Sequence, residues 1–567
     1  MGDTFGLWVQ MAAIAFHNFY FLGFLAGAFL LAMNAKDDST SKTVFTILGF
    51  VSLLPIVGFL VAAFLPVLGI DKANLSGNSS IIFAVCVMIS FGIAFIWLRF
   101  GVRKFDVISE KLTARSELER NQKTDAREME KYIPTSALNF DPLEYINLKK
   151  GTFIGLDEKK QPKYIPIVKD KPCAHIQVVG TTGAGKGVIL CVLASQFLDQ
   201  GEAVFFCDPK NDEWAPSVLY ASAQRTGKPY YYINLNRPHG AQFNLFEGAT
   251  EDEGFELFQA GFALTEKGDA SDFYGIQDRQ WAQRIAKQMA EGNLTIAEVY
   301  AQNEAALHDE ELGAAKFAGR LREMANTPSI NAKSGGVSLE KVIEEGGCVY
   351  VVGSMRNDIV KTAQRILLIR LIQLAERRDR MADVAPRRVA IVLDEVKYHL
   401  SRPALEALGA ARDKGVHVVL AHQSLGDLKD CTKDLNPDAV VDAVVENCKI
   451  KIAYQVQNPD TAEWMAKSSK KIQVDDEVRK VTRNLAHAEV VDDERTIKQA
   501  ERYLVDENML MSLVPSTAAV YGLGLTHFVS IRPLKVKKSR EAIKVYEVAG
   551  GTVKTTSDKI GELPTLE

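Results

Sequence analysis

Paired cysteines are missing from this chain of 567 residues. Its seven cysteines are scattered, their number is odd and none stands in a CxxC pair. Structural zinc sites and disulfide frameworks both depend on closely spaced or paired cysteines. The sequence therefore predicts neither kind of cysteine framework, and a reducing compartment fits its soluble part best.

An excess of positive charge is also missing. The chain has 67 Lys and Arg residues against 71 Asp and Glu residues, which gives a net charge of −4. The chain as a whole is therefore not a polycation built to bind nucleic acid, although a basic groove or pore is compatible with this average.

A cleavable signal peptide is the third absence, because no basic stretch precedes the first apolar run and that run is too long. Three apolar runs are present instead, at Phe5 to Met33, Val44 to Ile70 and Ile81 to Leu98. A bilayer core needs about twenty apolar residues in a helix. The second run meets this length and the third nearly does. The first run contains His17 and Asn18, so it either spans the membrane, lies at its interface or packs against a partner subunit.

Basic residues predict the orientation of these runs. Between the second and third runs, the loop Asp71 to Ser80 has Lys72 as its single basic residue. The residues that follow the third run include Arg99, Arg103, Lys104 and Lys111. Basic flanks stay in the cytoplasm. We therefore expect everything after Leu98 to be cytoplasmic, and the N-terminus to lie outside if all three runs span.

A glycine-rich stretch at Gly180–Gly187 dominates the soluble part. The apolar segment Ile176–Val179 precedes it and reads as a buried strand, and the helical segment Val188–Ala194 follows it. Strand, glycine-rich turn and helix form the context of a phosphate-binding P-loop, in which backbone N–H groups and the helix N-terminus surround an anion. Lys186 adds a full charge near the β- and γ-phosphates.

This stretch predicts an ATP site with Mg²⁺. The expected nucleotide-binding residues are Gly180, Thr181, Thr182, Gly183, Ala184, Gly185, Lys186, Gly187 and Val188. Gly187 stands where Ser or Thr normally supplies a hydroxyl to Mg²⁺, so this ligand must come from water or from another residue.

Strand-like apolar runs alternate with helical segments after the P-loop. They are 203–207, 230–235, 348–352, 389–393, 416–421, 450–454 and 518–522. Continuous apolar runs are typical of strands covered on both faces, which predicts an α/β fold with a mainly parallel sheet. The long gap from Arg237 to Gly347 reads as helices, including 272–290, 310–325 and one that begins at the capping box Thr295–Glu298. These helices form an inserted subdomain or thicken the core. Upstream, 151–156 and 163–167 read as a hairpin.

Two further strand ends complete the predicted site. The run Val389–Leu393 ends in Asp394 and Glu395, which is the Walker B form. Asp394 is expected to hold Mg²⁺ and Glu395 to polarise the attacking water. Gln423 follows the next strand and either senses the γ-phosphate or is an ordinary polar residue at a strand end.

The assembled motifs resemble the type IV coupling proteins, the TraG/TraD-like P-loop ATPases of bacterial conjugation and type IV secretion. The similarity runs from about Gly151 to Pro533. The stretches that carry it are Gly180–Gly187, Cys207–Asp212, Phe243–Phe246, Leu393–Glu395, Gly409–Gly415, Gln423–Leu425, Asn447–Ile452 and Asn458–Ala462.

The resemblance implies a RecA-like motor domain with an inserted all-α domain, assembled as a homo-hexamer in the bacterial inner membrane with its ATPase domain in the cytoplasm. Its implied partners are channel components of the secretion system and, as cargo, relaxase–DNA complexes or protein effectors with adaptors. The family usually has two spanning helices, whereas three apolar runs are present here.

The expected domains follow. They are a transmembrane region at 1–104 with two or three helices, a cytoplasmic linker at 105–147, a RecA-like domain at 148–248 and 346–540, an all-α insertion at 249–345 and a tail at 541–567. The tail after Pro533 is either a docking segment or disordered.

Two alternative functions stay open at this point. One is a DNA-pumping motor of the FtsK/HerA type, which the block from Arg412 to Leu425 disfavours. The other is a nucleotide-gated receptor with low turnover, which Gly187 keeps open.

Arg412 is the last candidate residue. It follows the expected helix 404–411 and precedes the strand 416–421, so we expect it near the sheet edge where Asp394 and Gln423 lie. From there it either reaches the nucleotide of a neighbouring subunit as an arginine finger or makes a surface ion pair.

Overall fold

The computed structural model describes residues 134–167, 174–266, 275–307, 314–379, 386–432, 434–483 and 489–548, with the backbone alone for 474–499. The three apolar runs and most of the predicted linker lie outside these residues. Within the described part of the chain, no helix combines the length and apolar character that crossing a bilayer requires. Residues 123–567 form one compact unit.

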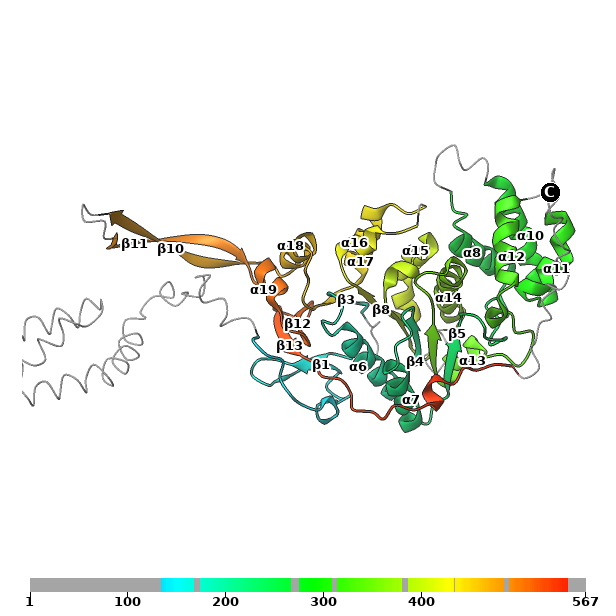
Figure 1. Ribbon diagram of the computed structural model, residues 1–567, viewed down its shortest axis with the longest axis horizontal. Coiled ribbons are helices and arrows are strands. Elements are labelled where there is room, and N and C mark those ends of the chain that lie inside the picture. The colour runs from blue at the N-terminus through cyan, green and yellow to red at the C-terminus, as the bar shows by residue number, and fades with distance from the viewer. Residues whose placement is uncertain are drawn as a thin grey trace, which may run out of the picture. The chain divides into compact units, whose positions relative to one another are not determined.

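A mixed sheet organises this unit (Figure 1). It has eleven strands in the order β2-β1-β13-β12-β9-β3-β8-β7-β4-β6-β5. The strands are β1 (Thr152–Leu156), β2 (Pro162–Ile165), β3 (Ile176–Val179), β4 (Ala203–Asp208), β5 (Tyr230–Asn234), β6 (Cys348–Val352), β7 (Val389–Leu393), β8 (Val416–His422), β9 (Ile450–Ala453), β12 (Thr517–Tyr521) and β13 (His527–Ser530).

The sheet is parallel from β9 through to β5 and antiparallel from β2 to the β12–β9 pair. The strands predicted from apolar runs are confirmed within one residue at each end, and so is the β1–β2 hairpin. β13 was not predicted. The parallel strands are buried on both faces, which is why they read as uninterrupted apolar runs.

Helices cover both faces of the parallel part (Figure 1). One hydrophobic cluster joins α6 (Lys186–Asp199) and α7 (Ala215–Thr226) to one face of the sheet. A second joins α14 (Asp358–Glu376), α15 (Arg402–Ala411) and α17 (Pro437–Asn447) to the other face. β4 supplies both clusters, because Phe205 belongs to the second and Phe206 to the first. This alternation fixes the register of the strand.

Helices fill the chain between β5 and β6. They are α8 (Glu251–Phe262), α10 (Ile276–Gly292), α11 (Ile296–Leu307), α12 (Ala315–Ala325) and α13 (Leu339–Glu345). Thr250 and Glu253 cap the start of α8 reciprocally. Thr295 and Glu298 do the same for α11, as their spacing predicted. Phe258 and Phe317 belong to the same cluster as Ile366 of α14, so the apolar core of these helices is continuous with one face of the sheet.

A long hairpin follows α18 (Pro459–Ser468) and precedes α19 (Glu507–Ser512). Its strands β10 (Lys471–Arg483) and β11 (Glu489–Tyr503) pair only with each other among the described residues. The hairpin was not predicted, because its sequence is rich in charged residues and contains no continuous apolar run.

Residues 531–548, which we call the C-terminal strap, run from β13 across α7 to β5 and contain one 3-10 helical turn at Glu541–Ile543 (Figure 1). The Ser539 N–H donates to Ser217 Oγ of α7 at 3.3 Å. Further along, the Tyr546 N–H donates to the Tyr232 carbonyl at 2.9 Å. The segment after Pro533, which the sequence left open between docking and disorder, is therefore ordered up to Val548.

Candidate functional site

The candidate site lies at the carboxyl edge of the parallel strands. β8 lies between the P-loop strand β3 and the Walker B strand β7, and β4 lies beyond β7. The loops that leave these strands meet around a cavity of about 420 Å³. Its lining includes Gly183, Gly185, Lys186, Gly187 and Asp394, so the predicted P-loop and metal residues share one cavity. Its volume is in the range of small-molecule and cofactor sites.

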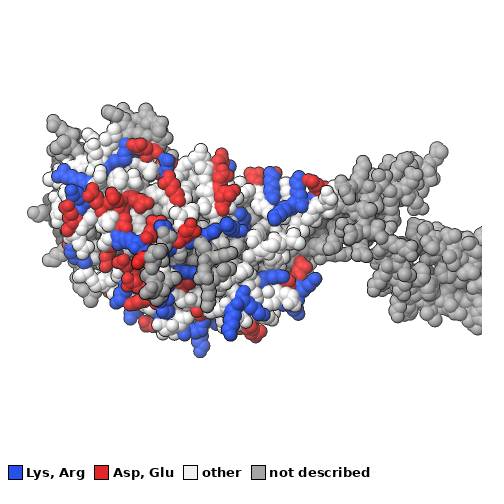
Figure 2. Space-filling model, turned by 180° about the vertical axis from the view of Figure 1, so that it is seen from behind, with Lys and Arg blue, Asp and Glu red and all other residues white. Residues whose placement is uncertain are grey.

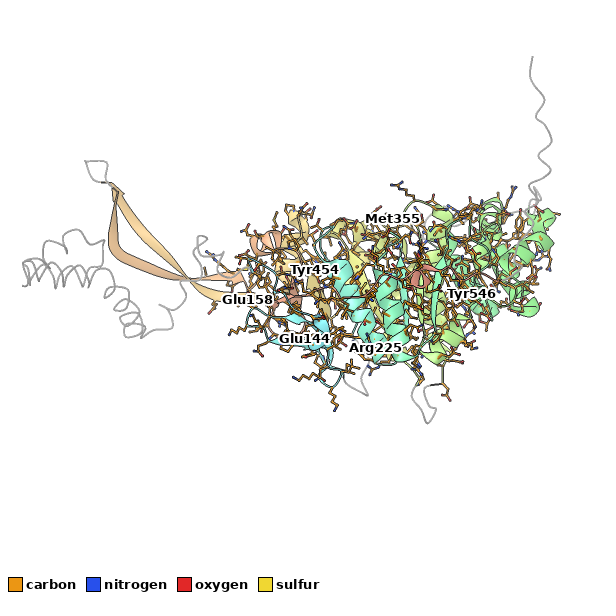
Figure 3. The ribbon with its side chains drawn as sticks, turned by 60° about the horizontal axis from the view of Figure 1, so that its bottom comes forward. Glu144, Glu158, Arg225, Met355, Tyr454 and Tyr546 are labelled. Carbon is orange, nitrogen blue, oxygen red and sulfur yellow. The ribbon has the colours of Figure 1, made fainter. Side chains whose placement is uncertain are left out.

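The glycines of the P-loop are required by the backbone and by Tyr454. Gly180 has a φ of +155° and Gly185 a φ of +121°, which side-chain-bearing residues rarely adopt. A Cβ atom at Gly180 would lie 2.6 Å from the Tyr454 Cβ, and one at Gly185 would lie 3.0 Å from the Tyr454 ring. Tyr454 directly follows β9 and is buried, and its side chain fills the space beside these two glycines (Tyr454 is labelled in Figure 3).

Lys186 opens α6 and is buried, with only 6 % of its surface exposed. Its ammonium donates to the carbonyls of Gly180 at 2.5 Å and Thr181 at 3.1 Å. No carboxylate of the described residues lies within ion-pair distance of it. Burial, and then the ammonium of Lys210, lower the pKa of Lys186. A buried cation held only by carbonyls of its own turn is electrostatically suited to receive an anion.

Gly187 leaves room beside this lysine. A Cβ atom at Gly187 would meet nothing within 4 Å, so the missing Ser or Thr hydroxyl is replaced by open space. Burial raises the pKa of Asp394, whose Oδ1 accepts a hydrogen bond from the Glu395 N–H at 3.1 Å. Mg²⁺ usually keeps several waters and binds proteins through one or two carboxylates. One carboxylate and an open space fit such an ion, with Asp394 as its protein ligand.

Glu395 and Gln423 are brought together. Glu395 is 2 % exposed, and its backbone is left-handed with a φ of +49°. The Gln423 Nε2 donates to Glu395 Oε1 at 2.9 Å. Thr182 Oγ1 of the P-loop donates to Gln423 Oε1 at 3.3 Å. The expected base is thereby connected to the P-loop through Gln423, and a left-handed non-glycine residue is a strained conformation often found at functional sites.

Lys210 is the residue of the site that sequence reasoning missed. Its ammonium lies 3.0 Å from Asp394 Oδ2 and 2.6 Å from Glu395 Oε1, and it lines the cavity. The sequence signal for Lys210 was the stretch Cys207–Asp212, which stands at the end of a predicted strand. The structure places this strand, β4, two strands away from β8. That stretch supported the family resemblance but received no role in the site, because strand order across the sheet was not known.

The expected position of Arg412 is wrong. Arg412 precedes β8, whose first residue Val416 pairs with Val389 at the start of β7. It therefore lies at the amino edge of the sheet, about 20 Å along the strands from the edge with Asp394 and Gln423. The reason is that α15 runs back across the parallel sheet, as a crossover helix must. His175, which precedes β3, hydrogen-bonds the Leu408 carbonyl of α15 at this same edge at 2.9 Å.

The histidines near the site have a structural role, because they hydrogen-bond other protein groups. His422 Nδ1 donates to the Ser424 carbonyl at 2.9 Å, and its Nε2 accepts from Gln177 Nε2 at 2.8 Å. Burial lowers the pKa of His422 to about 4, so its ring is neutral at physiological pH. His417 hydrogen-bonds Glu202 at 2.6 Å. The described residues contain no group of three or more metal-ligating side chains.

A larger and more open cavity of about 940 Å³ lies at the amino edge. Arg378 and Arg387 line it, together with Glu202 and Glu344. Arg378 donates to the carbonyls of Ala375 and Lys414, and Arg387 to that of Glu344. Both guanidinium groups thus already donate hydrogen bonds to backbone carbonyls. Among the described residues, no glycine-rich turn opens into this cavity. On the face seen from behind, residues of both charge signs are interspersed (Figure 2).

Comparison with known proteins relates the chain to conjugation proteins. Residues 388–515 match the family described as the TraM recognition site of TraD and TraG. The chain is 30 % identical over 312 residues to Mobilization protein A of Escherichia coli, an overlap that covers 55 % of this chain and 57 % of that protein. The chain thus spans just over half the length of this curated relative.

Solved structures share the fold. The unbound bacterial conjugative coupling protein TrwBdeltaN70 superposes with a TM-score of 0.52 at 17 % identity, over 73 % of this chain and 97 % of that one. TrwB in complex with the non-hydrolysable ATP analogue ADPNP superposes with a TM-score of 0.51 at 18 % identity, over 70 % and 92 %. The fold is therefore that of a RecA-like P-loop NTPase. The family match over residues 388–515 and the mobilization relative make the chain similar to the TraG/TraD-like coupling proteins of conjugation.

Proposed function

We propose that this chain is an ATPase that binds ATP with Mg²⁺ at the carboxyl-edge cavity and uses hydrolysis to drive substrate transfer in conjugation. The observation that carries the proposal is that Lys186 and Asp394 line one cavity, while Gln423 connects Glu395, the neighbour of Asp394, to Thr182 of the P-loop. The complex of the similar coupling protein TrwB with ADPNP supports a nucleotide as the ligand.

Each side chain has a task in this proposal. Lys186 neutralises charge on the β- and γ-phosphates, and the turn from Gly180 to Gly187 presents its N–H groups to them. Asp394 holds Mg²⁺, which supplies neutralisation of phosphate charge when it is bound. Glu395 takes a proton from the attacking water, and Gln423 orients Glu395 through its amide.

The proposal extends to a homo-hexamer anchored in the bacterial inner membrane, with the ATPase domain in the cytoplasm. Relaxase–DNA complexes, protein effectors with adaptors and channel components of a type IV secretion system are its partners. The match of residues 388–515 to a TraM recognition site supports a relaxosome protein among them.

The test of the chemistry is the variant Glu395→Gln in the full-length protein. Neutralising a general base costs about 10²- to 10⁴-fold in rate, while nucleotide binding persists. Glu202→Gln is the matched control, because Glu202 is as buried, at 3 % exposed, but lies at the amino edge. Turnover of Glu395→Gln at the rate of the unmodified protein would remove Glu395 from this role.

Cargo and topology need separate experiments. Transfer of plasmid DNA and of candidate protein substrates, measured in a deletion strain complemented with this chain, distinguishes the classes of cargo. Cysteine labelling from outside the cell at Thr4 and Ser76 tests the three spans, which predict labelling at both positions. Labelling at Ser76 but not at Thr4 would leave two spans.

A low-turnover receptor is the second candidate. The ion pair of Lys210 with Glu395 favours it, because the ammonium 2.6 Å from Glu395 Oε1 occupies an oxygen that would otherwise accept a proton from water. ATP turnover of the purified protein with and without DNA decides between the two functions.

A further inference from the structure

Lys210 is held in place by its own turn. Its backbone N–H donates to Asp208 Oδ1 at 2.8 Å, and the Asp212 N–H donates to Asp208 Oδ2 at 2.6 Å. Tyr350 Oη, from the buried strand β6, donates to the same Oδ2 at 2.6 Å. Asp208 is 2 % exposed, so this turn is fixed to the core and sends the Lys210 side chain into the cavity.

The ammonium of Lys210 contacts the Asp394 oxygen that accepts no backbone hydrogen bond among the described residues. Asp394 Oδ1 already accepts a hydrogen bond from the Glu395 N–H. Oδ2 is the oxygen that Lys210 contacts, at 3.0 Å. A metal ion that binds Asp394 through this oxygen would meet the ammonium, and two cations on one carboxylate oxygen repel each other. Lys210 and Mg²⁺ therefore compete for the same position.

The competition at Asp394 also affects Glu395. Lys210 bridges the two carboxylates, with its ammonium 2.6 Å from Glu395 Oε1. Without that cation, two adjacent carboxylates of low exposure would repel each other, and each would be more difficult to keep ionised. The Lys210 side chain is 34 % exposed, against 15 % for Asp394 and 2 % for Glu395. The cation is thus the member of the trio with room to move.

We propose that Lys210 is a positioning residue. Its ammonium holds the Asp394 and Glu395 carboxylates together while no metal is bound, and it moves away from Asp394 Oδ2 when Mg²⁺ and nucleotide bind. The inference rests on the proposed function for the nucleotide, but the competition with Mg²⁺ does not require hydrolysis. After the exchange, Lys210 remains in the cavity with Lys186, where a polyphosphate offers its ammonium a new partner. Release from Glu395 Oε1 at the same step frees that oxygen to accept a hydrogen bond from water.

The experiment titrates Mg²⁺ alone against the full-length protein in detergent and follows the thermal unfolding midpoint. Removing the competing cation in Lys210→Met should lower the Mg²⁺ concentration for the half-maximal shift by at least about 10-fold. Lys210→Arg keeps the charge and should stay within about twofold of the unmodified protein. Lys210→Gln, which can still donate hydrogen bonds to both carboxylates, should change in the direction of Lys210→Met and serves if that variant does not fold.

The matched control is Lys397→Met. Lys397 also pairs with two carboxylates, Asp427 at 3.3 Å and Asp430 at 3.1 Å, but it does not line the cavity. It should leave the Mg²⁺ titration unchanged. A second readout is the affinity for a fluorescent ATP analogue with Mg²⁺ and with EDTA, whose ratio should rise about 10-fold in Lys210→Met.

The outcomes separate the two proposals. An identical Mg²⁺ titration for folded Lys210→Met or Lys210→Gln and the unmodified protein would overturn the exchange and leave Lys210 as a permanent ion pair. Failure of the unmodified protein to bind the ATP analogue would overturn the proposed function. In that case the titration with Mg²⁺ alone still decides on Lys210.

Discussion

The two edges of the parallel sheet use charged residues in different ways. At the amino edge, the Arg378 guanidinium donates to carbonyls of Ala375 and Lys414, and Arg387 donates to those of Glu344 and Gly201. Apart from the bond to Ala375, three residues away, these bonds connect segments that are distant in the chain. At the carboxyl edge, Lys186 is held by its own turn and Lys210 by two carboxylates.

Buried acids show the same contrast. Glu202 at the amino edge is 3 % exposed and pairs with His417, whereas Glu395 at the carboxyl edge is 2 % exposed and pairs with Lys210 and Gln423. Burial alone does not separate the two residues. The difference lies in the partners, because Glu202 pairs with the buried His417, whereas Glu395 pairs with Lys210, whose side chain is 34 % exposed and lines the carboxyl-edge cavity. Whether a buried charged group has a structural or a chemical role thus depends on its neighbours.

Arg412→Ala is the strongest test of this contrast, because it asks whether the amino edge takes part in chemistry in a neighbouring subunit. If Arg412 is an arginine finger, its variant should bind ATP normally and hydrolyse it about 10³-fold more slowly. Mixed with Lys186→Ala subunits, it should regain part of its turnover in an ATPase assay. Full activity of Arg412→Ala alone would make this residue a surface charge.

Lys186→Ala should produce the next largest effect. Removing the cation of the P-loop should weaken binding of a fluorescent ATP analogue by at least about 100-fold, in line with the loss of one strong electrostatic contact. Lys397→Ala, at the same sheet edge, is the control and should bind like the unmodified protein. Equal affinities for the two variants would contradict the P-loop assignment.

Arg387→Met tests the structural side of the comparison. It removes donors from two carbonyls, and we expect the free energy of unfolding to fall by about 3 kcal/mol. ATP affinity, measured at a temperature where the variant is folded, should stay unchanged. A loss of nucleotide affinity without a loss of stability would show that the two edges are not independent.

The smallest expected effect concerns pH. Burial lowers the pKa of His175 to about 4, below the ordinary 6.5, and the same holds for His399 and His422. Each contributes stability that is fully present above pH 6.5 and is lost as the pH falls toward 4, because the unfolded chain takes up the proton first. His175→Gln should reduce the loss between pH 7 and pH 5 by roughly 1–2 kcal/mol, measured as the pH dependence of unfolding. An unchanged dependence would mean that the pKa of His175 is the same in the folded and the unfolded chain.

Much of the fold could be predicted because its signals are local. Apolar runs gave the parallel strands, the Thr295–Glu298 capping box gave the start of α11, and the glycine-rich turn gave the P-loop. What could not be predicted depends on strand order. Lys210 reaches Asp394 because β4 lies beside β7, although 185 residues separate Asp208 from Leu393. Arg412 was misplaced because proximity along the chain to Asp394 and Gln423 was taken for proximity in the sheet.

The pairing of β1 with β13 has a consequence for the synthesis of the protein. β1 pairs at once with β2, but Leu156 also pairs with Ser530, so the second edge of β1 must wait for 374 residues (530 minus 156) before its partner exists. At about 5–20 residues per second, this wait lasts on the order of 20–75 s. The P-loop strand β3 likewise waits for β8 and β9 on both its sides. We therefore expect the nascent chain to expose unpaired strand edges to chaperones for most of its translation, and to gain a nucleotide site only after β8 has been synthesised.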